Sequence, residues 1–203
     1  MPRHRTIAIT ALATSLLALS ACSRTVVERD LATDYDTSDA FQSVDFWHNL
    51  PGNSAVTNGE GLHGLILFAD GQDPNTTYEE RVDYLKALGW LPERFDEPAE
   101  MAMRRGTLAK GLVSALNIEG GVMYRLTGVA RYANRELVFL NIMPAGTDYQ
   151  VLNGYEYVGV ISKAQDYELL QQGLKAENVP PSAEELEGGD AAEEAPPEPD
   201  DAG

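Results

Sequence analysis

Apolar side chains recur every three or four residues through most of the middle of the chain, as they do along one face of a helix. The residues that carry this spacing are Leu62, Leu65, Ile66 and Phe68, then Val82, Leu85 and Leu88, then Leu108, Leu112, Val113 and Leu116, then Tyr132, Leu137, Phe139 and Leu140, and finally Tyr157, Val158 and Ile161. Alternation typical of a strand is confined to one short segment. The pattern therefore predicts a mainly α fold.

Polar residues that can cap a helix stand at the start of several of these stretches. Thr57 is followed three residues later by Glu60, and Asn153 is followed by Glu156, which is the spacing of a capping box. Thr77 precedes another apolar stretch and can cap its helix. These signals predict where three of the helices begin.

One segment between the helices has a different pattern. Val122 and Tyr124 alternate with other residues inside the sequence EGGVMYRLTG, residues 119–128, which has glycines at both ends. Alternation of β-branched and aromatic residues between glycines is typical of short strands. The segment near 120–128 is therefore predicted to be a short β-hairpin or a loop.

A short glycine motif occurs three times at a nearly constant interval. In each copy a polar residue precedes a first glycine and a second glycine follows five residues later, in the pairs Gly59 with Gly64, Gly106 with Gly111, and Gly154 with Gly159. The first glycines are 47 and then 48 residues apart, and a fixed period of this size indicates a repeated supersecondary unit. The missing side chain at the second glycine predicts that another backbone approaches closely there.

One proline precedes each copy of the glycine motif. Pro51, Pro92 and Pro144 each follow a helix-like stretch and precede one copy of the motif, and proline cannot continue a helix. The repeated unit is therefore expected to be a helix, a loop with proline, and a second helix opened by the motif. We expect the three units at about residues 40–70, 78–118 and 130–168.

The unit resembles the surface-layer homology (SLH) module, whose helix-opening motif is Ile-Thr-Arg-Ala-Glu. Residues 56–60, Val-Thr-Asn-Gly-Glu, match this motif in threonine and glutamate, and residues 103–107, Met-Arg-Arg-Gly-Thr, match it in the arginine. The third copy, residues 152–154, keeps little of it. The stretches 84–92 and 95–118 also resemble that module. Over about residues 40–168, the resemblance implies three helix-loop-helix repeats in one pseudo-threefold bundle.

SLH modules tether proteins to cell-wall polymers, often acidic ones, and the resemblance implies that the motif arginine binds the ligand. Arg105 is that residue in the second unit, and Asn58 and Asn153 are expected in the same place in the other two units. Trp47 and Trp90 each precede a proline turn and are candidates for stacking on a sugar ring. Burial in the core is the interpretation we favour for both, because tryptophan is highly buried on average.

The first 22 residues have the layout of a bacterial lipoprotein signal. A basic start with Arg3 and Arg5 precedes an apolar run that ends at Leu19 and is shorter than the roughly 20 residues needed to span a membrane. The sequence Leu-Ser-Ala-Cys at the end resembles a lipobox, so we expect cleavage before Cys22 and acylation of this sole cysteine. In the lipoproteins it resembles, an aspartate after the cysteine favours the inner membrane. Ser23 stands there instead, which favours the periplasmic face of the outer membrane.

Charge and composition limit the partners of the remaining chain. The formal net charge is −17, and residues 175–203 hold ten acidic residues and one basic residue among prolines and glycines. Such a segment cannot bury enough apolar surface to fold, so a disordered tail is predicted. Residues 23–39 are expected to form a linker, which leaves one domain over 40–170. The acidic balance argues against nucleic acid and against charge-driven docking to anionic lipid.

No residue pattern indicates catalysis. His48 and His63 lack metal-ligand spacing and are expected at helix surfaces or helix ends, and neither a Gly-x-Ser-x-Gly nor a Walker motif occurs. We therefore expect a non-enzymatic, lipid-anchored envelope protein, without metal or cofactor, that tethers or docks to peptidoglycan or another wall polymer. The alternative is an accessory scaffold lipoprotein that binds an envelope protein and has no affinity for glycan.

Overall fold

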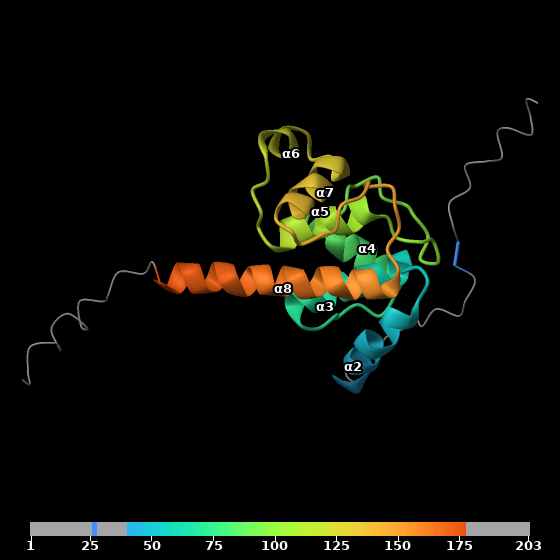
Figure 1. The fold of residues 1–203 in the computed structure, drawn as a ribbon. Coiled ribbons are helices and arrows are strands. Elements are labelled where there is room, and N and C mark those ends of the chain that lie inside the picture. The colour runs from blue at the N-terminus through green and yellow to red at the C-terminus, as the bar shows by residue number, and fades with distance from the viewer. Residues whose placement is uncertain (1–25, 28–39, 178–203) are drawn as a thin grey trace, which may run out of the picture. The chain divides into compact units, whose positions relative to one another are not determined.

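The regular structure of the described part of the chain is helical. The computed structural model describes residues 26–27 and 40–177 (Figure 1). Its elements are α2 (Ala40–Asn49), the 3-10 turn η2 (Leu50–Gly52), α3 (Asn58–Asp70), α4 (Tyr78–Ala87), α5 (Arg105–Ala115), α6 (Val122–Thr127), α7 (Ala130–Phe139) and α8 (Gly154–Glu177). Pairing of extended backbone within these residues is limited to three isolated β-bridges, and no strand forms there. The prediction of a mainly α fold is confirmed.

Three helix starts are held by the side chains that the sequence indicates. Thr57 accepts a hydrogen bond from the Glu60 backbone N–H at 3.2 Å, and the Glu60 carboxylate accepts one from the Thr57 N–H at 2.9 Å. Asn153 and Glu156 form the same reciprocal pair at the start of α8. Thr77 caps α4 as predicted. These bonds satisfy backbone donors that the first turn of a helix leaves unbonded, so they fix where the helices begin.

Backbone hydrogen bonds link the start of one helix to the segment that leads into the next. At the start of α3, the Asn58 N–H donates to the Met101 carbonyl at 2.8 Å, in the segment before α5. At the start of α5, the Arg105 N–H donates to the Gln150 carbonyl at 2.8 Å, in the segment before α8. The two donor residues, Asn58 and Arg105, each come directly after the N-cap residue of their helix. The two acceptor residues each lie in the segment that precedes the next glycine motif.

A third link returns from the last motif to the first. The Gly154 N–H at the start of α8 donates to the Asn53 carbonyl at 2.8 Å, and the Val56 N–H donates to the Leu152 carbonyl at 2.9 Å. Both bonds join the segment before α3 to the segment that opens α8. The three segments that carry the glycine motifs thus form a closed ring of backbone contacts.

Packing at the second glycine of the motif is close in two of the three copies, but side chains approach there and the predicted backbone does not. A Cβ atom on Gly111 in α5 would lie 2.3 Å from the Cδ2 atom of Leu65 in α3, and one on Gly64 would lie 2.8 Å from the Tyr157 hydroxyl oxygen. Leu65 and Tyr157 are both fully buried. The two glycines therefore let neighbouring helices place large side chains against the α3 and α5 backbones.

The third copy does not follow this rule, and the close packing predicted at Gly159 is wrong. No atom lies within 4 Å of the Cβ position of Gly159, which is exposed. The reason is register: counted from the N-cap, Gly64 and Gly111 lie seven residues into their segments, whereas Val160 holds that position after Asn153. Val160 is buried, so the equivalent place in α8 carries a core side chain.

The segment near 120–128 forms a short helix, and the prediction of a hairpin or loop is wrong. Gly121 is the N-cap of α6, and Gly128, at a φ of 60°, ends the helix in the left-handed conformation that favours glycine. The Thr127 hydroxyl also donates to the Met123 carbonyl at 2.6 Å within the helix. The glycines that bound this segment therefore act as helix ends.

The ends of the chain are only partly described. Val27 pairs with the segment before α5, because its N–H donates to the Glu100 carbonyl at 3.0 Å. Helix α8 continues through Glu177, so three residues expected in the tail are helical, and the helix from Glu168 onward belongs to a second unit. The signal, Cys22, most of the linker and residues 178–203 lie outside the described residues. None of the described helices is both long and apolar enough to cross a membrane.

Candidate functional site

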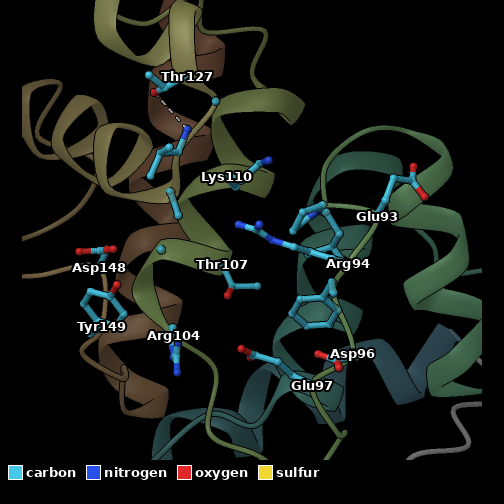
Figure 2. A pocket seen from close by; sticks show the side chains of 17 residues that line it. Glu93, Arg94, Asp96, Glu97, Arg104, Thr107, Lys110, Thr127, Asp148 and Tyr149 are labelled. Carbon is cyan, nitrogen blue, oxygen red and sulfur yellow. Dashed lines mark hydrogen bonds between the residues drawn. The ribbon is translucent and has the colours of Figure 1, made fainter.

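A groove of about 630 Å³ lies beside the first half of α5 (Figure 2). One wall is the loop after α4, residues 91–97, and the other is the first half of α5 with its N-cap, residues 104–110. Residues 127–130, between α6 and α7, and residues 148–149 complete the lining. We call this the α5 groove. Its walls come from segments that are far apart in the sequence and that the fold brings together.

Two cationic side chains extend into the α5 groove from opposite walls. Arg94 comes from the loop after α4 and Lys110 from α5 (Figure 2). Burial lowers the pKa of Lys110, and the positive charge of Arg94 lowers it further. Neither side chain forms an ion pair with any residue in the described part of the chain. The groove therefore holds two like charges that are not ion-paired within the described residues, and a bound anion would relieve their repulsion.

A third cation lies beside the same groove on an aromatic ring. The guanidinium carbon of Arg104 is 5.3 Å from the centre of the Tyr149 ring, which is within the range of a cation–π contact. Four carboxylates also line the groove, namely Glu93, Asp96, Glu97 and Asp148. In Figure 2, Asp96 and Glu97 appear in the lower part of the groove, and Lys110 appears in the upper part. The groove thus offers an anion-accepting part next to a polar and aromatic part.

Arg105, the arginine singled out by the resemblance, is not part of the groove lining. Its side chain is buried, at 4 % exposure. The guanidinium donates to the Pro144 carbonyl and, at 3.4 Å, to the Oδ1 atom of Asn134. Asn134 in turn donates to the Gly146 carbonyl at 2.9 Å. Arg105 therefore holds the loop ahead of α8 in place, and its burial lowers its pKa.

Asn58 has the corresponding position at the start of α3 and a corresponding role. It is fully buried, and its Nδ2 atom donates to the Pro98 carbonyl at 3.0 Å in the loop ahead of α5. Its Oδ1 atom is buried without a hydrogen-bond partner among the described residues. Asn58 and Arg105 thus both anchor the loop that leads to the next motif, instead of facing an open groove.

Asn153 does not occupy the same place as Asn58 and Arg105, so this part of the expected alignment is wrong by one residue. Asn153 is the N-cap of α8, where Thr57 and Arg104 stand in the other two segments. Gly154 follows it, and a Cβ atom there would lie 1.6 Å from the Leu50 carbonyl oxygen. The chain has no room for an asparagine or arginine at that position.

Both tryptophans pack against the core. The Trp47 ring stacks on Tyr157, with ring centres 6.5 Å apart and an interplanar angle of 23°, and meets Phe46 edge-on. Trp90 is also partly buried against the core. This is the arrangement that we favoured for both residues, and in it their rings contribute to packing between the helices.

A buried polar cluster between α3 and α4 was missed at the sequence level. His63, expected at a helix surface or end, is only 3 % exposed, and its Nδ1 atom lies 2.6 Å from Oδ2 of Asp73. The Arg81 Nε donates to the same oxygen, and its Nη2 donates to the Asn75 carbonyl at 2.8 Å. His48, by contrast, is exposed at the end of α2 as expected. The Asp-Pro-Asn sequence at 73–75, typical of a turn, was the available signal.

The charges in this cluster are set by burial and by one another. Burial lowers the pKa of His63 even though the Asp73 carboxylate favours its protonated form. Burial alone would raise the pKa of Asp73, but hydrogen bonds from His63, Arg81 and Asn75 outweigh this and hold it below its usual range. The cluster thus consists of a neutral histidine, a carboxylate and a guanidinium, and it joins α3, the following loop and α4.

The described residues include no group of three or more histidine, cysteine, aspartate or glutamate side chains placed to hold a metal ion. The sequence did not identify the residues that line the α5 groove, because the resemblance to the SLH motif pointed to Arg105 and not to Arg104.

In comparisons with known proteins, the chain matches no protein-family model, no curated protein and no solved structure.

Proposed function

We propose that this chain is a lipid-anchored cell-envelope protein that binds an anionic group of a wall polymer in the α5 groove. The protein would have no catalytic role and would link the membrane to the wall. The single observation that carries the ligand-binding part is the placement of Arg94 and Lys110 in the groove without carboxylate partners among the described residues. Carboxylate and phosphate groups are the natural partners of such a pair.

The geometry around these two cations suits a sugar polymer with acidic substituents. The Thr107 hydroxyl lies in the same lining and can donate or accept a hydrogen bond. Tyr149 is largely exposed, so one end of the groove carries an aromatic surface as well as charge. An anionic substituent between Arg94 and Lys110 would place the attached sugar ring toward these neutral groups.

The proposed fold assignment is a divergent SLH-like domain with three units arranged with pseudo-threefold symmetry. The closed ring of backbone contacts among the three motif segments supports it, since each motif is bonded to a segment that leads into another. The equivalent roles of Asn58 and Arg105, which both anchor the following loop, support it as well. In this chain the motif arginine would serve the fold, and its neighbour Arg104 would face the ligand.

The anchor and the location are proposed from the sequence. The lipobox-like Leu-Ser-Ala-Cys sequence supports acylation of Cys22, and Ser23 supports retention at the periplasmic face of the outer membrane. Residues 23–39 would then connect the acylated cysteine to the domain. Labelling of cells with a radioactive fatty acid, with Cys22→Ala as the control, tests the anchor. Equal labelling of the two proteins would contradict it.

Sedimentation with purified sacculi of the native host tests the binding function. Residues 23–203, which carry no acyl chain, would be compared with an Arg94→Gln, Lys110→Gln variant. Each charge-assisted contact contributes about 1.5–3 kcal/mol, so we expect the variant to bind about tenfold more weakly or worse. An Arg125→Gln, Arg131→Gln variant removes the same charge from exposed positions on α6 and α7 and should bind normally.

Two results would overturn the proposed binding site. One is saturable binding that the groove variant does not weaken. The other is the absence of binding by the unchanged protein at low and at high salt. The second result would favour the alternative, an accessory scaffold lipoprotein without glycan affinity, and crosslinking in whole cells would then identify its protein partner.

A further inference from the structure

Helix α6 has no buried side chain, although it is rich in apolar residues. Val122 and Leu126, four residues apart on one helix face, are 78 % and 77 % exposed, and Met123 is also exposed. Phe139, the last residue of α7, is 80 % exposed. Single exposed apolar residues are ordinary in folded proteins, but a group of large ones on adjacent helices indicates an interaction surface.

Val122, Met123 and Phe139 belong to one continuous feature. A depression of about 360 Å³ is lined by residues of α6 and α7, including Val122, Met123, Tyr132 and Phe139. The Glu136 carboxylate in α7 accepts a hydrogen bond at 3.0 Å from the Gly121 N–H, the N-cap of α6, and so ties the two helices together. We give the name α6–α7 surface to the exposed residues Val122, Met123, Leu126 and Phe139 together with the half-buried Tyr132. Leu126 lies outside the depression, on the same face of α6 as Val122.

The charges on these two helices are opposite in sign to those of the whole chain. Between residues 122 and 139 the sequence has three arginines, Arg125, Arg131 and Arg135, all exposed, and Glu136 as the single acidic residue. Glu136 is already engaged with Gly121. Because exposed charges are screened over about 8–10 Å at moderate salt, this local positive charge matters more at a contact than the net charge of −17.

We propose that the α6–α7 surface docks onto an anionic lipid surface. Apolar side chains flanked by arginines are the combination that holds amphipathic helices at a membrane interface, where the rings and aliphatic groups enter the headgroup region. A second copy of this chain is a poorer occupant, because a symmetric contact would set the three arginines of each copy against one another. An acidic partner protein would satisfy the arginines, but nothing in the chain indicates one. The net negative charge of the whole chain argued against docking to anionic lipid, but residues 122–139, which include this surface, carry a net positive charge.

This inference goes beyond wall binding and does not depend on it. Docking of this kind would add a second membrane contact to the proposed lipid anchor at Cys22. Docking through α6 and α7 would also orient the α5 groove, because residues 127–130 that join the two helices form part of its lining.

The test is sedimentation of residues 23–203 with vesicles of phosphatidylethanolamine that contain phosphatidylglycerol, with vesicles of phosphatidylcholine as the neutral comparison. We expect binding to the anionic vesicles only, weakened by added salt. A Leu126→Ser, Phe139→Ser variant should bind about tenfold more weakly. The matched control, Val44→Ser with Tyr155→Ser, removes two apolar side chains of similar exposure elsewhere and should bind normally.

The charge variant Arg125→Gln, Arg131→Gln should also bind more weakly and show a smaller dependence on salt, while the Arg94→Gln, Lys110→Gln variant should keep its vesicle binding. The inference is overturned if the unchanged protein does not bind anionic vesicles, or if the apolar variant and its control bind equally. It is also overturned if light scattering shows a dimer that the Leu126→Ser, Phe139→Ser variant abolishes and vesicles do not compete with. That result would assign the surface to a second copy.

Discussion

Arg104 and Arg105 are consecutive in the chain, yet their guanidinium groups lie in different environments. The Arg104 guanidinium carbon is 5.3 Å from the centre of the exposed Tyr149 ring, beside the α5 groove. Arg105 is buried and donates to the Pro144 carbonyl. One residue can therefore meet a ligand, and the other supports the loop from which Tyr149 extends.

This difference predicts opposite consequences for two alanine substitutions. Arg105→Ala removes the donors that satisfy a loop carbonyl and Asn134, so the free energy of unfolding should fall by about 1–3 kcal/mol. Arg104→Ala removes a cation–π contact with an exposed ring and should cost no more than about 0.5–1 kcal/mol. Urea denaturation followed by circular dichroism measures both values. A larger loss for Arg104→Ala than for Arg105→Ala would contradict these assigned roles.

The second glycines of the motif allow a paired prediction. Gly111→Ala places a Cβ atom against the Leu65 side chain in the core and should destabilise the protein by about 1–3 kcal/mol. Gly159→Ala adds a methyl group in open space on α8 and should stabilise the protein by about 0.5–1 kcal/mol, since alanine favours helix. Thermal unfolding of the two variants distinguishes the sites, and equal shifts of both melting temperatures would show that the register is assigned wrongly.

The buried cluster predicts that acid destabilises the protein in two steps. The pKa of His63 is lowered by burial, so below about pH 6.5 the unfolded chain binds a proton that the folded protein resists. The free energy of unfolding therefore falls as the pH decreases through this range. The pKa of Asp73 is lowered by its hydrogen bonds, so a second loss follows below about pH 4.

Urea midpoints measured across this pH range test the assignment to His63. His63→Gln should remove the first loss and leave the second, whereas His48→Gln, at an exposed histidine, should leave both unchanged. A first step that persists in His63→Gln would show that another group is responsible for it.

Among the residues of the buried cluster, Asp73 is expected to be the one whose substitution destabilises the fold most. Asp73→Asn keeps the size of the side chain but replaces the carboxylate that pairs with the Arg81 guanidinium, which is only 1 % exposed, by a neutral amide. Loss of one partner of a buried ion pair typically costs about 3–5 kcal/mol. An exposed control is Asp83→Asn in α4, which should change stability by less than about 0.5 kcal/mol. A small effect of Asp73→Asn would mean that water replaces the carboxylate.

Local patterns in the sequence predict the helices and their starts well. Spacing of apolar residues identifies α3, α4, α5 and α7, and the capping residues Thr57 and Thr77 locate the first turns of α3 and α4, because these signals depend on a few neighbouring residues. The same approach fails where glycines have two roles. Gly121 and Gly128 suggested a strand segment but act as the ends of α6.

The candidate site could not be predicted in the same way. Its lining comes from segments between residues 91 and 149 that meet only in the folded protein. The motif resemblance identified Arg105, but whether a side chain faces a groove or a loop depends on tertiary packing, and here Arg104 faces the groove. A shift of one residue in the third motif also placed Asn153 wrongly, since polar residues and glycines at helix starts can be aligned in two registers.

The titration of Lys110 in the presence of a wall polymer tests the central claim most directly. The lysines of residues 23–203 would be carbon-13 methylated, and their NMR signals followed against pH with and without solubilised fragments of the native wall, with Lys110→Gln to assign the signal. An anion held between Arg94 and Lys110 stabilises the charged amine, so the pKa of Lys110, lowered in the free protein, should rise on binding. The signal of the exposed Lys163 should stay unchanged. Polymer binding that leaves the Lys110 pKa where it was would contradict the account.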